Sequence, residues 1–209
     1  MAGRTLLEPL PHRLGLMCGT FDPPHIGHLL VAHTAVEQLG LAQVLFVPVG
    51  QPTHKTTLTP AAQRVAMTQA AIADNPHFAL DLTDVEREPP HYTATLLPLL
   101  QAKFPQSELW LLLGEDSLRD LPTWHKPDLV CAQARLAVLP RPGVVRDVSA
   151  DRADVTWLDG PAVHLSSTML RARLGAGFSG RYVLPTAVQA YIQAAQLYRH
   201  HGEAGRVVV

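Results

Sequence analysis

The feature that most constrains the fold is a repeated change in the spacing of apolar residues along the chain. A continuous apolar run over residues 14–18 is followed, over residues 26–39, by apolar side chains at helical spacing that end before Gly40, a C-cap residue. Continuous apolar runs are typical of strands buried on both faces, and parallel strands need helical crossovers between them. The alternation therefore predicts an α/β fold with a parallel sheet and helices on both of its faces.

The same alternation continues along most of the chain, which predicts a single domain over residues 14–200. Residues 1–13 and 201–209 have no periodic apolar face and are predicted to be an N-terminal extension and a C-terminal tail. Further strands are predicted at residues 42–48, 77–82, 109–113, 135–139 and 155–158. Further helices are predicted at residues 59–73 with Thr59 as N-cap and Pro60 at the first helical position, at 92–104 with a kink at Pro98, at 167–174 and at 186–198.

Composition and charge narrow the class of function. The 209 residues are 47% hydrophobic and 17% charged, which is typical of a globular chain, and the formal net charge is -1 with a pI near 6.8. This balance lacks the basic footprint that nucleic acid requires, so a phosphate ligand is expected to be small. Cys18 and Cys131 lie far apart and neither a signal peptide nor a membrane span is recognisable, which favours a reduced cytoplasmic protein. The sequence leaves the oligomeric state open and is compatible with a homo-oligomer.

The motif "CGTFDPPHIGH" over residues 18–28 directly follows the first predicted strand. Ligands of open parallel sheets bind beyond the carboxyl ends of the strands, where the strand order reverses. Gly19 and Gly27 allow a tight turn and a close approach of backbone amides to an anion, and the Asp22 side chain is expected to cap the turn. His25 and His28 flank a helix N-terminus, which itself favours negative charge. The motif predicts a phosphate site.

The histidine pair alone has less specific interpretations. Two histidines three residues apart are often a solvated surface pair, and a zinc site would need a third ligand or a zincin-type glutamate. Ile26 and Gly27, between the histidines, supply neither, so no protein metal site is predicted.

The whole string resembles the signature of the nucleotidyltransferases, which begins Gly-(Ser/Thr)-Phe-Asp-Pro and ends His-x-Gly-His. Four later segments are similar, in order, to motifs of the bacterial nicotinate-nucleotide adenylyltransferases, and the resemblance covers roughly residues 14–198. These segments are "VPVGQPTHK" at 47–55, "DVEREPPHYTATL" at 84–96, "LLGEDSLRDLPTWHKPDLV" at 112–130 and "LSSTMLR" at 165–171.

The resemblance implies a Rossmann-like sheet of nucleotidyltransferase type and transfer of the adenylyl group of ATP to nicotinate mononucleotide, with Mg²⁺ bridging the ATP phosphates. It assigns catalysis to His25 and His28. The residues that it implies for ATP binding are Gly19, Thr20, Phe21, His25, His28, Ser167, Thr168 and Arg171. Those that it implies for nicotinate mononucleotide binding are Lys55, Tyr92, Thr93, Gly114, Asp116, Trp124 and His125.

Several of these residues have simpler interpretations. Trp124 would fill a gap in the core, and Tyr92 would be a packing residue without contact to a ligand. Asp116 would cap the helix after Gly114. The loop with His54 and Lys55 would be a solvated loop.

The chain also departs from the family pattern at two places. Cys18 stands where most members have glycine, and Pro89-Pro90-His91 stands where a Gly-x-Ser turn is usual. Two rival functions stay open, namely another adenylyl- or cytidylyltransferase, with a nicotinamide mononucleotide or phosphopantetheine acceptor, and a non-enzymatic nucleotide sensor.

Overall fold

A computed structural model of the chain describes residues 12–52, 59–140 and 155–199. Its centre is a sheet of six parallel strands in the order β3-β2-β1-β4-β5-β6, as expected for a Rossmann-like fold. The chain starts in the middle at β1, builds outward to β3, and returns to β4 on the other side of β1, so the strand order reverses between β1 and β4. The strands are β1 His12–Gly19, β2 Gln43–Pro48, β3 Phe78–Leu80, β4 Ser107–Gly114, β5 Arg135–Leu139 and β6 Val155–Trp157.

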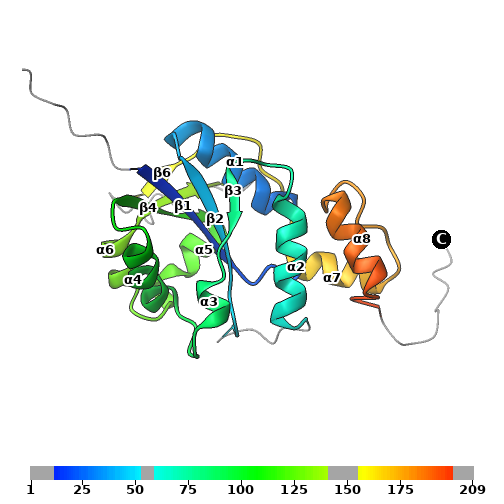
Figure 1. The fold of residues 1–209 in the computed structure, drawn as a ribbon. Helices are drawn as coiled ribbons and strands as arrows, with labels where there is room; N and C mark the ends of the chain where they lie inside the picture. The colour runs from blue at the N-terminus through cyan, green and yellow to red at the C-terminus, as the bar shows by residue number, and fades with distance from the viewer. Residues whose placement is uncertain (1–11, 53–58, 141–154, 200–209) are drawn as a thin grey trace, which may run out of the picture.

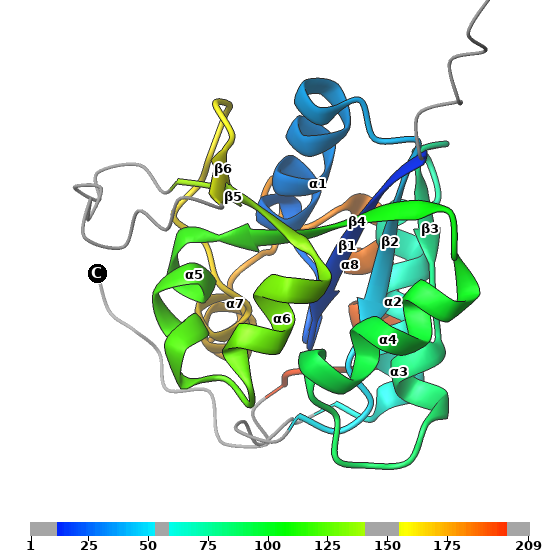
Figure 2. The same cartoon turned by 90° about the vertical axis from the view of Figure 1, so that its left-hand side faces the viewer.

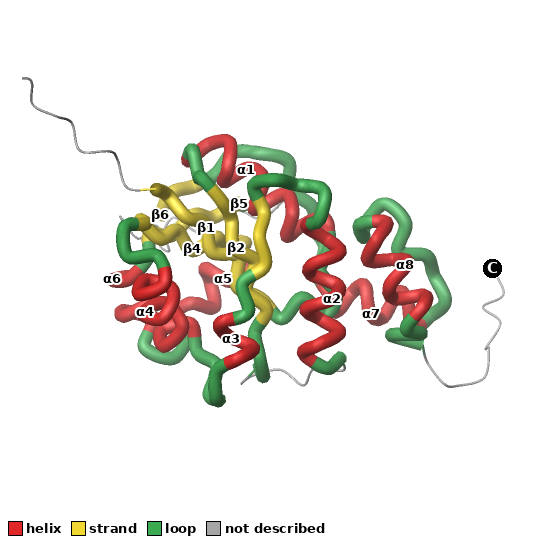
Figure 3. Tube along the Cα trace, in the orientation of Figure 1, coloured by secondary structure: helices red, strands yellow, loops and turns green. Residues whose placement is uncertain are grey.

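Helices cover both faces of this sheet, as predicted (Figure 1). Helices α1 and α2 pack on one face and α4 and α6 on the other, while α2 stands between the sheet and α8 (Figures 1 and 3). The helices are α1 Ile26–Leu39, α2 Ala61–Ile72, α3 Thr83–Glu86, α4 Thr93–Lys103, α5 Glu115–Asp120, α6 Pro127–Gln133, α7 Ser167–Gly175 and α8 Thr186–Ala194, with a 3₁₀ turn, η1, at Leu121–Thr123. None of the helices in the described ranges is long and apolar enough to cross a bilayer.

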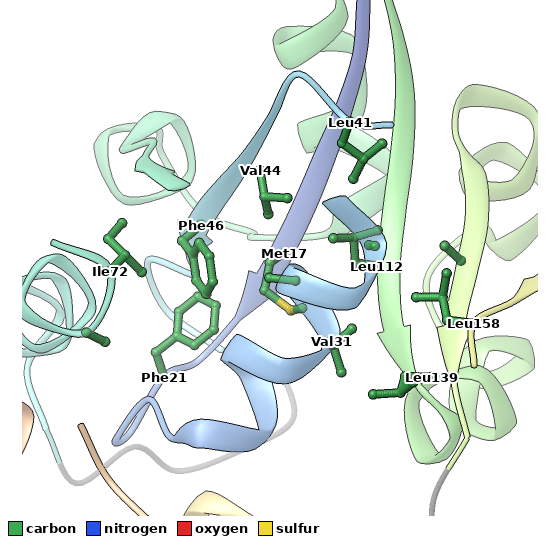
Figure 4. Close-up of a cluster of buried hydrophobic side chains, with 14 of the residues drawn as sticks. Met17, Phe21, Val31, Leu41, Val44, Phe46, Ile72, Leu112, Leu139 and Leu158 are labelled. Atoms are coloured by element: carbon green, nitrogen blue, oxygen red, sulfur yellow. The ribbon is translucent and has the colours of Figure 1, made fainter. Parts of the chain in front are cut away.

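The apolar runs of the strands divide into two cores because successive side chains point to opposite faces of a sheet. On β4, Trp110 and Leu112 pack in the core beneath α1 and α2, whereas Leu111 packs in the core beneath α4 and α6. Figure 4 shows the first of these cores, in which Met17 and Leu112 from neighbouring strands lie beside Val31 of α1. Burial on both faces explains why these strands lack polar alternation in the sequence.

Most predicted segments are present with shifted ends. The bounds of α1 and β5 agree with the sequence prediction, and Gly40 ends α1 in the left-handed region at φ 60°. β1 begins two residues earlier than predicted, at His12, and α4 continues through Pro98. The predicted helix at 186–198 ends at Ala194, and Gln196 and Tyr198 have positive φ.

The predicted N-cap of α2 is wrong. Pro60, not Thr59, is the N-cap residue, and no side chain caps this helix end. Thr59 is engaged elsewhere, since its hydroxyl donates to the Tyr198 hydroxyl and its carbonyl accepts from Arg64.

The helices α3 and α6 and the turn η1 were not predicted, and α5 was expected only as a helix of unstated length after Gly114. They contain between three and seven residues, which is too short for apolar side chains to repeat at helical spacing.

We expect Leu97→Ala to lower the free energy of unfolding by about 2–5 kcal/mol, because the Leu97 side chain on α4 is fully buried and its loss leaves a cavity. Leu99→Ala on the same helix removes a side chain that is 45% exposed and should cost no more than about 0.5 kcal/mol. Urea denaturation of the two variants measures the difference. Equal losses would contradict the assignment of Leu97 to the core.

Candidate active site

A cleft of about 1060 Å³ opens at the carboxyl ends of β1 and β4, where the strand order reverses. In Figure 2 the arrows of β1 and β2 point toward the end of the molecule at which α3 and α7 lie. Every predicted site residue within the described ranges lines this cleft, whereas His54 and Lys55 lie outside those ranges. The residues brought together are Gly19, Thr20, Phe21, His25, His28, Tyr92, Thr93, Gly114, Asp116, Trp124, His125, Ser167, Thr168 and Arg171.

His25 and His28 form one stacked unit at the start of α1. Their ring centroids are 3.7 Å apart with an interplanar angle of 28°, and the backbone N–H of His25 donates to His28 Nδ1 at 3.1 Å. Because His28 Nδ1 accepts this bond, its Nε2 carries the ring proton and is the donor atom. The Phe21 ring packs against the His28 ring in an edge-to-face contact, with ring centroids 5.1 Å apart.

Packing explains the glycines of the motif. A Cβ at position 27 would lie 3.0 Å from His25 Nδ1, so Gly27 makes room for the His25 ring. A Cβ at position 19 would lie 3.1 Å from the Phe21 ring. In the turn after β1 the left-handed φ is found at Phe21, where φ is 51°, and not at Gly19. The role of these two glycines is therefore to leave space for neighbouring rings.

Helix α7 forms the opposite wall of the cleft at this end. The Ser166 hydroxyl caps it by accepting from the Met169 N–H at 3.2 Å, and the Ser167 hydroxyl donates to the Pro23 carbonyl at 2.8 Å. Arg171 Nη1 donates to the Asp22 carbonyl at 2.7 Å, and Nη2 donates to Thr168 Oγ1 at 3.2 Å. A helix N-terminus, a hydroxyl and a guanidinium therefore face the histidine pair, which is an arrangement suited to anions.

A fully buried arginine on α2 holds the loops beneath this site. Arg64 donates to the carbonyl oxygens of Thr20, Val49, Gly50 and Thr59 at 2.6–3.1 Å. Burial lowers the pKa of its guanidinium, and the nearby Asp22 carboxylate opposes that shift. Sequence analysis did not identify Arg64.

A signal for Arg64 was nevertheless present in the sequence. Residues 64, 67, 68 and 71 follow helical spacing, so Arg64 shares the buried stripe of α2 with Met67 and Ala71.

Asp22 does not cap its own turn, contrary to the prediction. Its carboxylate is buried, and Oδ1 accepts from the hydroxyl of Tyr198 at 2.7 Å, across 176 residues of sequence. Burial raises the pKa of the Tyr198 phenol far above its usual range, so this hydroxyl stays protonated and remains a donor. Sequence analysis also missed this contact, because nothing local relates the two residues.

The other half of the cleft carries an aromatic wall. The rings of Tyr92 and His125 stack with centroids 4.2 Å apart, and Trp124 beside them lines the cleft while packing against the core below. Trp124 thus combines the packing role with a position on the cleft. Asp116 lies in the first turn of α5 and accepts from Arg119 at 2.8 Å. Gly114 leaves open space, because a Cβ there would meet nothing within 4 Å.

The unusual Pro89-Pro90-His91 segment is tied to the loop after β2 through Asp84. This buried carboxylate accepts from Arg87 Nε at 2.6 Å and from the Gly50 N–H at 3.0 Å, and His91 Nδ1 lies 3.4 Å from it. The His91 ring packs so closely on Gly50 that a Cβ there would lie 2.4 Å from His91 Cε1.

Cys18 lies on the floor of the cleft in ordinary strand backbone, as expected for a position that does not demand glycine. Burial, together with the nearby charges of Asp84 and Asp81, raises the pKa of its thiol to about 12. Within the part of the chain that the structure describes, no three His, Cys, Asp or Glu side chains are grouped as a metal site.

The position of the cleft, with the histidine pair and the start of α7 lining one end of it, is typical of a nucleotidyltransferase site on a Rossmann-like sheet. In agreement, the family model described as cytidylyltransferase-like matches residues 16–173, which is most of the chain. Within that class the chain belongs to the nicotinate-nucleotide adenylyltransferase family, as comparison with curated proteins shows.

The relatives and solved structures are similar over nearly their whole lengths. A probable nicotinate-nucleotide adenylyltransferase of Thermomicrobium roseum is 44% identical, over 90% of this chain and 92% of that protein. A probable nicotinate-nucleotide adenylyltransferase of Exiguobacterium sibiricum is 41% identical, over 89% of this chain and 98% of that protein. The Plasmodium falciparum nicotinic acid mononucleotide adenylyltransferase complexed with NaAD superposes with a TM-score of 0.77 at 18% identity, covering 90% of this chain and 97% of that one, and shows the same fold.

We expect Gly50→Ala to lower the free energy of unfolding by about 1–3 kcal/mol, because the added methyl group overlaps His91 Cε1 and lies 2.8 Å from the Asp84 carbonyl oxygen. Gly114→Ala is the matched control and should change stability by no more than about 0.5 kcal/mol. In a His91→Ala background the cost of Gly50→Ala should shrink, which urea denaturation of the double-mutant cycle measures. Strict additivity would show that the two residues do not touch.

Proposed function

We propose that this chain transfers the adenylyl group of ATP to nicotinate mononucleotide, which yields nicotinate adenine dinucleotide and pyrophosphate in NAD biosynthesis. The observation that carries the proposal is the cleft itself, in which the histidine pair and α7 form one end and the aromatic wall forms the other. Relatives that carry this name at 37–44% identity support it. Free thiols at Cys18 and Cys131 suit a reducing compartment, and we place the reaction in the cytoplasm.

The ATP phosphates would lie between the start of α1 and the start of α7. His28 Nε2 is the donor atom of its ring, and the backbone N–H of His25 fixes that ring in place. On the other side, Thr168 and Arg171 would hold the β- and γ-phosphates through a hydroxyl, helix amides and a guanidinium. Ser167 holds α7 against Pro23, and the backbone from Gly19 to Phe21 would line the nucleotide.

The chemistry then needs no protein nucleophile and no general base. A phosphate oxygen of nicotinate mononucleotide, already anionic near neutral pH, attacks the α-phosphorus of ATP in line with the bond to the β-phosphate. The new P–O bond forms as that bond breaks, and pyrophosphate leaves with the electron pair. His25 and His28 would stabilise the charge that develops on the α-phosphate, because donors fixed in advance favour the transition state.

Mg²⁺ would be held mainly by the ATP phosphates and water. The buried carboxylates that border the cleft are already engaged, Asp22 with Tyr198 and Asp84 with Arg87, so the donor set fits an ion carried by the nucleotide. Bound in this way, the ion would neutralise charge on the phosphates and on the departing pyrophosphate.

Nicotinate mononucleotide would occupy the half of the cleft beneath the aromatic wall. Trp124 would stack on the pyridine ring, and the first amides of α4 at Thr93, with the backbone near His125, would donate to its carboxylate. Tyr92 and His125 stack on each other and close this side, while Gly114 leaves room for the ligand and Asp116 would bind a ribose hydroxyl. Lys55 stays a proposed contact from the loop after β2.

The decisive experiment supplies ATP and Mg²⁺ with nicotinate mononucleotide, its amide or phosphopantetheine in separate reactions and identifies the products by mass. We expect kcat/KM for the acid to exceed that for the amide by roughly tenfold or more, because amide donors favour a carboxylate over a neutral carboxamide. Equal values would remove the acid preference but leave adenylyl transfer. A product formed only with phosphopantetheine would assign the other transferase, and ATP binding without turnover of any acceptor would indicate a sensor.

We expect His25→Ala and His28→Ala each to lower kcat by about 10²-fold or more, because each removes a group positioned for the charged transition state. His33→Ala is the matched control, since His33 lies on the same helix but is exposed and pairs with Glu37. Steady-state kinetics measure the loss, and circular dichroism checks the fold. A kcat close to that of the unaltered protein would remove the histidine pair from the mechanism.

A further inference from the structure

Tyr198 reaches the phosphate end of the cleft from outside it. The residue follows α8, where the chain turns at positive φ, and its hydroxyl donates to Asp22 Oδ1 at 2.7 Å. The hydroxyl is itself held in place, because it accepts from Thr59 Oγ1 at 3.3 Å. A side chain near the C-terminal end of the described chain therefore touches the loop that precedes the histidine pair.

The Asp22 carboxylate is 2% exposed, so its charge needs partners inside the protein. Tyr198 supplies a neutral donor to Oδ1. Arg171 lies on the side of Oδ2, but its Nη1 is 4.0 Å away and donates instead to the Asp22 carbonyl oxygen at 2.7 Å. Arg64 is a second cation near Asp22, and its donors are directed to loop carbonyls. Arg171 therefore touches the Asp22 backbone without closing a tight ion pair with its side chain.

This geometry has a consequence for the charge of Arg171. A guanidinium locked in a close carboxylate pair is neutralised and turned away from other anions. In the structure Arg171 donates through Nη2 to Thr168 Oγ1, and Thr168 lines the cleft at the N-terminus of α7. If Oδ1 lost its neutral donor, the buried carboxylate would draw the guanidinium closer and out of the cleft.

We propose that Tyr198 is a positioning residue that, by donating to Asp22, keeps the Arg171 guanidinium on the cleft wall and available to the triphosphate of ATP. This inference rests on the proposed function in one respect, namely that ATP phosphates bind beside α7. It concerns the Tyr198 hydroxyl alone, because the aromatic ring packs against the core whether or not the oxygen is present.

Tyr198→Phe tests the proposal because it deletes one oxygen atom and keeps the ring. We expect the dissociation constant of ATP with Mg²⁺, measured by calorimetry, to rise roughly tenfold, as for the loss of a charge-assisted contact. The KM for nicotinate mononucleotide should stay within about twofold of the original, since that half of the cleft is not involved. Tyr191→Phe on α8 is the matched control, as this half-buried tyrosine packs on the same core.

A second substitution tests the route through Asp22. Asp22→Asn keeps an oxygen acceptor but removes the charge that would attract Arg171, so in the Tyr198→Phe background it should return ATP affinity to within about threefold of the Asp22→Asn single variant. A structural role for Tyr198 would instead lower the melting temperature and leave ATP affinity unchanged. That result overturns the proposal, and so does a loss of ATP affinity that Asp22→Asn fails to restore.

Calorimetry keeps this test separate from the proposed reaction. If the unaltered protein binds ATP but forms no dinucleotide from nicotinate mononucleotide, the proposed function fails, while the effect of Tyr198→Phe on ATP affinity still decides the role of Tyr198.

Discussion

The buried guanidinium of Arg64 is the interaction on which the architecture of the cleft depends. Parallel strands deliver their carboxyl ends to one edge of the sheet, where the loops that follow carry carbonyl groups that the sheet cannot satisfy. Arg64 donates to carbonyls in the loop after β1, the loop after β2 and the segment before α2, so one side chain joins three segments. A neutral residue of similar volume would fill the space but leave those carbonyls buried without donors, at a cost of about 1–3 kcal/mol for each.

The two halves of the cleft are assembled in different ways. The half with the histidine pair combines early and late parts of the described chain, because the loop at Asp22 meets α7 through Arg171 and the segment after α8 through Tyr198. The half with the aromatic wall is more local, since Tyr92 directly precedes α4 and His125 lies between η1 and α6. The strand order explains the difference, because the reversal between β1 and β4 separates the walls and leaves later helices to complete one of them.

Whether a feature of this structure could be predicted depends on how far apart in the sequence its interacting residues lie. Helix α1 and strand β5 were placed correctly because their apolar spacing and the end signal at Gly40 are local. Most of the site residues in the cleft were predicted from the resemblance of ordered motifs to those of the family, and the structure brings the described parts of these motifs to one cleft. Tyr198 was missed because its partner is 176 residues away. Thr59 was misassigned as a cap for the same reason, since a distant tyrosine takes its hydroxyl.

Cys18 on the floor of the cleft has a consequence for the chemical selectivity of the site. A thiol with a pKa of about 12 is almost wholly protonated at pH 7. Although it lies beside the proposed path of a phosphorus electrophile, it does not compete with an anionic phosphate for attack. Because this thiol stays protonated, oxidants and alkylating reagents that require a thiolate should react with Cys18 only slowly.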